Sequence, residues 1–191
     1  CALPMAAVPG NHDRRAAMAD ALRGSRVWVG DDGDGFLNRA MDVGALHVIA
    51  LDTLDEGRSA GLLCEARLRW IGKRLEAAHD RRVVLFMHHP PFPIGQPLAD
   101  GIACVGGPTL GTLVARHGGV LAVSCGHVHR AAHRAWAGTI GNVCPSVAWE
   151  VALDQRSGGA VPLVPQQPAY QLHDWRPDTG LVTHIRVLPD L

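Results

Sequence analysis

The sequence has no net charge and no long apolar run. Its 18 basic and 18 acidic side chains cancel, so bulk charge does not attract a polyanion such as nucleic acid or an anionic membrane surface. No apolar stretch is long enough to cross a bilayer, and no signal-peptide pattern is present. We therefore expect neither nucleic acid nor a membrane as the main partner.

The sequence also lacks paired cysteines. Its five cysteines are widely scattered, their number is odd, and no C-x-x-C pair occurs. This pattern argues against a disulfide framework and a zinc ribbon, and it favours a reducing, cytoplasmic location with mostly buried thiols. The sequence leaves room for one bridge.

The chain has enough apolar residues to form the core of a single domain over residues 1–191, since 47% of its 191 residues are hydrophobic. Short apolar runs and helical spacings alternate in the first part of the chain. Strands are predicted over residues 3–8, 27–29, 36–43, 46–51, 83–87 and 120–123, and helices over residues 14–22, 64–78 and 109–115. Antiparallel strands are predicted over residues 131–137, 139–143, 147–153, 170–175 and 181–188, with a Gly/Pro-rich loop over residues 158–168. This order predicts an α/β fold with a mixed sheet or two packed sheets.

Three polar clusters each follow an apolar run. They are Gly10-Asn11-His12-Asp13, His88-His89-Pro90 and Gly126-His127-Val128-His129, and they contain five of the 11 histidines. Ligands in open α/β sheets usually bind at the carboxyl ends of strands, which is where these clusters fall. Any one histidine could be an ordinary buried or surface residue, but three such clusters together predict a metal site.

Imidazole nitrogens and an amide oxygen suit zinc, iron and manganese. His127 and His129 would face the same side on an extended strand, but in a loop they can diverge toward two neighbouring metals. Two metals a few ångströms apart can clamp the attacking and leaving oxygens of a phosphoryl transfer.

These three clusters resemble the last three motifs of the calcineurin-like metallophosphoesterases. Within that superfamily the chain is most similar to the class III cyclic nucleotide phosphodiesterases and to glycerophosphodiesterases. The resemblance covers essentially the whole chain and implies a four-layer α/β/β/α sandwich of mixed sheets with flanking helices.

The resemblance also implies a role for each site residue. Asn11, His88 and His127 would bind one metal of a pair, and His129 would bind the other. Asn11 would also contact the substrate. His12 would lie over the substrate phosphate as general acid or transition-state stabiliser, with Asp13 orienting its ring. His89 would contact substrate or support its neighbours. The cofactors would be two divalent or mixed-valence ions of iron, manganese or zinc.

Two earlier motifs of the family, D-x-H and G-D, have no counterpart before Pro9, where the family order would put them, and no D-x-H occurs later in the chain. They would supply the bridging aspartate and further ligands, and Asp52 corresponds instead to a structural aspartate of the family. We therefore expect an N-terminally truncated copy of an active enzyme, with a naturally degenerate form as the alternative. The 191-residue chain alone is expected to bind the metal pair poorly and to show weak activity or none.

The expected activity is hydrolysis of a small phosphodiester, such as 3′,5′-cyclic AMP or a glycerophosphodiester, by a metal-bridging hydroxide. The alternatives are a broad-specificity phosphomonoesterase and a non-catalytic binding domain on the same fold. A homo-oligomer is also compatible with the sequence, because the C-terminal strands could form an interface.

Overall fold

A six-stranded mixed sheet forms the centre of the computed structural model, which describes residues 3, 5–28, 30, 35–156 and 162–189. The strand order is β3 (Arg39–Val43), β4 (Leu46–Leu51), β5 (Arg82–Met87), β6 (Val120–Cys125), β8 (Thr139–Val143) and β7 (Ala132–Trp136). Strands β4, β5, β6 and β8 are parallel, whereas β3 and β7 pair antiparallel at the two edges. The mixed sheet agrees with the α/β class expected from the sequence.

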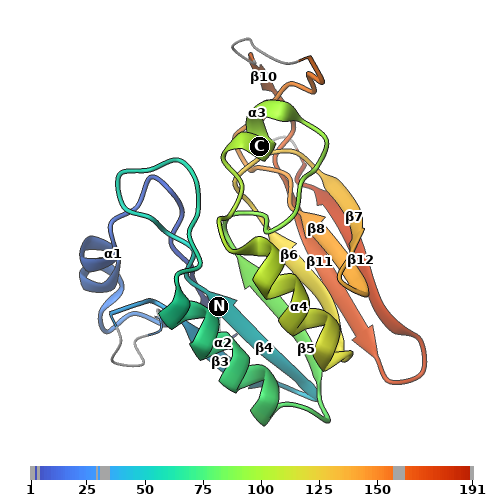
Figure 1. Ribbon diagram of the computed structural model, residues 1–191. Coiled ribbons are helices and arrows are strands. Elements are labelled where there is room, and N and C mark those ends of the chain that lie inside the picture. The colour runs from blue at the N-terminus through green and yellow to red at the C-terminus, as the bar shows by residue number, and fades with distance from the viewer. Residues whose placement is uncertain (1–2, 4, 29, 31–34, 157–161, 190–191) are drawn as a thin grey trace.

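Helices α2 (Glu65–Ala77) and α4 (Gly107–His117) cover one face of this sheet (Figure 1). Both helices place apolar residues at helical spacing toward the sheet. Ile71 and Leu110 are fully buried there, and they belong to the same apolar cluster as Val83 and Leu85 of β5. Strand β5 is buried on both sides and therefore reads in sequence as a continuous apolar run.

A two-stranded antiparallel pair, β11 (Ala169–Arg176) and β12 (Gly180–Val187), lies against the other face (Figure 1). The Ser124 hydroxyl of β6 donates a hydrogen bond to Gln171 Oε1 at 3.0 Å, and the rings of Phe86 and His173 meet edge to face. Helices, mixed sheet and strand pair thus form successive layers, and the expected sandwich of sheets with flanking helices is confirmed.

The remaining elements lie around the carboxyl ends of the central strands. Strand β1 (Met5–Ala6) pairs in parallel with β2 (Val27–Trp28), and α1 (Arg15–Leu22) lies between them in sequence. Helix α3 is formed by Pro97–Gly101, and β9 (Trp149–Val151) pairs antiparallel with β10 (Leu163–Pro165). No helix among the described residues is both long and apolar enough to cross a membrane.

Three details differ from the sequence prediction. Helix α3 was not predicted, and β10 falls in the segment 158–168 predicted as a loop, of which residues 158–161 lie outside the described residues. Strand β8, predicted among antiparallel strands, runs parallel to β6. The chain leaves β6, returns as edge strand β7 and turns at Ala137-Gly138, both with positive φ, so that β8 enters between them.

Candidate metal centre

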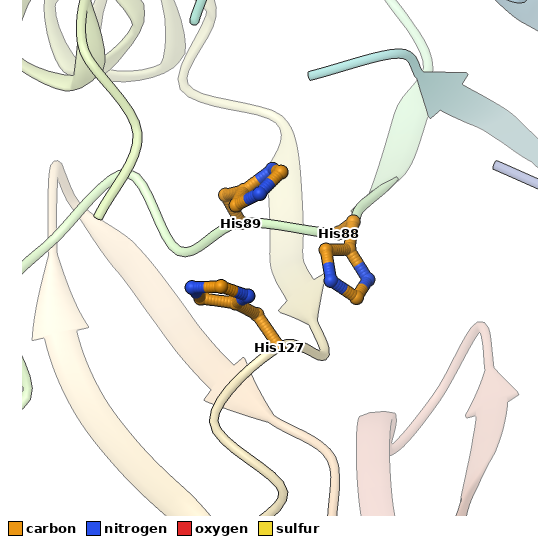
Figure 2. A group of neighbouring side chains, drawn as sticks. All are labelled: His88, His89 and His127. Atoms are coloured by element: carbon orange, nitrogen blue, oxygen red, sulfur yellow. The ribbon is translucent and has the colours of Figure 1, made fainter. Parts of the chain in front are cut away.

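Three strand ends bring the sequence-predicted ligands together. His88 directly follows β5, and His127 comes two residues after β6. Strands β5 and β6 are parallel neighbours with Met87 opposite Cys125, so their carboxyl ends meet at one edge of the sheet. Figure 2 shows the rings of His88, His89 and His127 gathered at this edge, with ligand atoms within 4.8 Å of one another.

Asn11 completes this group from the loop after β1. Its Oδ1 atom lies 3.1 Å from His88 Nε2 and 3.2 Å from His127 Nδ1. A metal about 2.1 Å from each ligand atom would place neighbouring ligand atoms about 3.0 to 3.4 Å apart in octahedral or tetrahedral geometry. The two distances from Asn11 and the chemistry of the donor atoms therefore fit a metal ion bound by Asn11, His88 and His127.

The backbone around these residues is specialised for close approach. A Cβ atom on Gly10 would lie 2.8 Å from His88 Cε1, so only glycine lets the Asn11 loop pass this ring without displacing it. His127 and His129 have φ angles of 71° and 59°, in the left-handed region that non-glycine residues rarely adopt. Such strain persists where the surrounding fold imposes it, and it occurs preferentially at functional sites.

Burial keeps the clustered imidazoles neutral. It lowers the pKa of His88 to about 3, with repulsion from His127, His129 and His12 as smaller causes. Burial also lowers the pKa of His127 to about 4, although the nearby Ile102 carbonyl acts in the opposite direction. Neutral imidazole is the form that binds metals, so both rings can bind a metal without losing a proton.

His12 and Asp13 lie at the exposed end of the Asn11 loop. Repulsion from His12 lowers the pKa of both His88 and His127, which places His12 near the cluster. The Asp13 carboxylate accepts a hydrogen bond from the Gly10 backbone N–H at 2.8 Å. In this conformation the Asp13 carboxylate therefore binds the backbone of its own loop, whereas the resemblance implied that it would orient the His12 ring.

His129 is held by β9. Its Nδ1 lies 3.2 Å from the Trp149 carbonyl oxygen, and the centroids of the two rings are 4.0 Å apart. A carbonyl only accepts, so Nδ1 carries the proton and Nε2 keeps a lone pair for a metal. Arg130 pairs with Glu150 and ties the same loop to β9.

The sequence left the role of His89 open between substrate contact and support of its neighbours. It is fully buried, and its Nδ1 lies 2.8 Å from the hydroxyl of Thr53, which is also fully buried. Burial lowers the pKa of His89 to about 3. Full burial favours a supporting role over substrate contact. No role was predicted for Thr53, although it follows β4 by two residues just as His89 follows β5.

Asp52 has the structural role expected of it. Its fully buried carboxylate accepts hydrogen bonds from Arg15 Nε at 2.6 Å and from the backbone N–H groups of Leu37 and Leu54, with Arg67 at 3.5 Å. These contacts account for the carboxylate without a metal, and they connect α1 to the end of β4.

The sequence profile described as calcineurin-like phosphoesterase matches residues 1–131, which include all three polar clusters. The chain belongs to this family. The resemblance inferred from the motifs is thereby confirmed, together with the fold that it implied.

Individual relatives agree with this assignment. The chain is 34% identical over 183 residues to a probable glycerophosphodiester phosphodiesterase of Arcobacter nitrofigilis, covering 95% of this chain and 66% of that protein. It is 34% identical over 170 residues to a probable cyclic nucleotide phosphodiesterase of Rhodopseudomonas palustris, covering 87% and 61%. The chain therefore spans about two thirds or less of the length of these relatives.

A solved structure supports the fold independently. A dimetal phosphatase from Danio rerio superposes with a TM-score of 0.58 at 17% identity, covering 72% of this chain and 59% of that one. At this identity the likeness concerns the fold alone.

Proposed function

We propose that this protein is a metal-dependent phosphodiesterase that hydrolyses small phosphodiesters. The placement of Asn11 Oδ1 close to both His88 Nε2 and His127 Nδ1 carries the proposal, because it groups three possible metal ligands beside the strand ends. The matching relatives are named for glycerophosphodiester and cyclic nucleotide hydrolysis, which supports a diester as the substrate class.

Each residue has a distinct task in this proposal. Asn11, His88 and His127 hold one metal ion, and His129 offers Nε2 to a second. When bound, such ions polarise a phosphoryl oxygen and lower the pKa of a bound water. His12 lies at the exposed side of the cluster, where it can reach the phosphate and pass a proton to the leaving oxygen.

The balanced charge of the chain favours a small substrate. The chain has equal numbers of basic and acidic residues, which gives no bulk attraction for a nucleic acid. Glycerophosphodiesters and 3′,5′-cyclic AMP are therefore the preferred candidates, and iron, manganese and zinc are the candidate ions. A cytoplasmic location and a homo-oligomer stay predictions.

The test compares a phosphodiester with a phosphomonoester. The purified chain, and any longer form that its gene encodes, are assayed with Mn²⁺, Zn²⁺ or Fe²⁺ on bis-(p-nitrophenyl) phosphate and on p-nitrophenyl phosphate. We expect faster metal-dependent hydrolysis of the diester, and loss of that hydrolysis in His127→Ala. His133→Ala is the control, because His133 lies on edge strand β7 and bonds Asn142 instead of the cluster.

Preference for the monoester would identify a phosphatase on the same fold. Metal binding without hydrolysis of either compound, in every form tested, would identify a binding domain. Either result would refute the proposed activity.

A further inference from the structure

The contact between Thr53 and His89 follows from the register of the central sheet. Strands β4 and β5 are parallel neighbours with Leu51 opposite Met87. Thr53 and His89 each lie two residues beyond that pair, so the loops that leave the two strands place them side by side. The Thr53 hydroxyl lies 2.8 Å from His89 Nδ1 and accepts the His89 backbone N–H at 3.3 Å. One hydroxyl thus restrains both the ring and the backbone of His89.

Gly61 encloses the same ring from another side. A Cβ atom there would lie 2.5 Å from His89 Cγ and 2.6 Å from Nδ1, so the segment packs directly on the imidazole. The Nε2 atom of His89 is buried and makes no hydrogen bond of regular geometry to the described residues, although the Ser59 carbonyl is near enough to raise the pKa of this ring. The ring has little freedom to turn, because packing and the Thr53 hydroxyl both restrain it.

His89 in turn packs against both histidines of the candidate metal centre. Its ring centroid lies 4.8 Å from that of His88, at 86°, and 4.5 Å from that of His127, at 54° (Figure 2). The rings of His88 and His127 are 5.2 Å apart. Rotation of either ligand ring toward His89 would therefore require His89 to move.

We propose that Thr53 and His89 form a positioning pair, in which the Thr53 hydroxyl fixes His89 and His89 holds the His88 and His127 rings with their ligand nitrogens toward Asn11. This inference deepens the proposed function and rests on it. Metal-binding histidines depend on such supporting groups, whose loss weakens metal affinity about 10- to 100-fold.

The test replaces the hydroxyl with a methyl group of similar size. Thr53→Val removes the contact with His89 Nδ1, whereas Thr53→Ser keeps it. Thr139→Val is a matched control, since the buried Thr139 Oγ1 on β8 has no hydrogen-bond partner among the described residues. Two readouts are taken on each purified variant: the ¹⁵N-edited NMR signals of the histidine rings without metal, and the Kd for Mn²⁺ by calorimetry.

We expect Thr53→Val to shift or broaden the ring signals of His88 and His127. The same variant should raise the Kd for Mn²⁺ about 10-fold or more. Thr53→Ser and Thr139→Val should leave both readouts near those of the parent chain. Unchanged ring signals in Thr53→Val would overturn the positioning role whatever the activity. Equal effects in Thr139→Val would also overturn it, because a general loss of stability would then explain the result. If neither the parent chain nor any longer form that its gene encodes binds Mn²⁺, the proposed function fails, and the ring signals alone decide whether the pair positions His88 and His127.

Discussion

Substitution of Gly10 by alanine should disrupt the candidate metal centre without unfolding the protein. The added Cβ would lie 2.8 Å from His88 Cε1, 2.9 Å from Nε2 and 3.0 Å from Nδ1. Carbon atoms prefer separations of about 3.5 Å or more, so the ring must retreat by roughly 0.7 Å. Metal–ligand distances tolerate only about 0.2 Å. The displacement is thus several times what a bound metal can accept.

We expect Gly10→Ala to raise the Kd for Mn²⁺ at least about 10-fold, which corresponds to a loss of about 1.4 kcal/mol of binding free energy. The assay is calorimetric titration of the purified chain, with circular dichroism and thermal melting to confirm that the fold is retained. The ring NMR signals of His88 should move in the same variant, since its imidazole is the group that the new methyl group displaces.

Gly126→Ala provides a matched control on the same ring. A Cβ atom at Gly126 would lie 3.6 Å from His88 Nδ1, which is an ordinary van der Waals contact. This variant should bind Mn²⁺ like the parent chain. Equal losses in both variants, or none in Gly10→Ala, would refute the claim that close packing of Gly10 on His88 maintains the site.

Three further predictions concern the framework of the protein. Asp52→Asn should lower the free energy of unfolding, measured by urea titration, by about 3 kcal/mol, because it leaves two arginines without their buried partner. Asp55→Asn removes a pair in which Arg58 is exposed and Asp55 partly exposed, and it should cost below about 1 kcal/mol. Equal costs would contradict this account. Leu85→Ala should lower the free energy of unfolding by about 3 kcal/mol, because it leaves a cavity in the core. Leu98→Ala, at a half-exposed position, should lower it far less in the same assay. Burial lowers the pKa of His173, so the unfolded chain binds this proton more readily and stability falls as pH drops below about 6.5. His173→Gln should lose less stability than the parent chain between pH 7.5 and 5.5 in urea titrations, and an identical loss would show that His173 does not contribute.

Much of the fold and of the candidate site was accessible from local sequence. The apolar run of β5, the helical spacing in α2 and the hairpin of β3 and β4 were predicted close to their observed bounds, because local periodicity reflects burial directly. The polar clusters that contain Asn11, His88 and His127 were located in the same way, since each follows an apolar run. The family resemblance then singled out these three residues as candidate ligands. The short elements α3 and β10 were missed, because they have too few residues to show a period.

The residue types and their places at strand ends were therefore determined by the sequence itself. Only the tertiary structure decided that the Thr53 hydroxyl faces His89, that Gly10 packs on the His88 ring, and that the Trp149 carbonyl restrains His129. These pairs come from segments distant in sequence, and their contacts depend on strand register and on left-handed backbone at His127 and His129. No local turn fixes the register of the parallel strands β4 and β5, because a long connection joins them. Their register depends on which faces of the whole strands are buried against their neighbours.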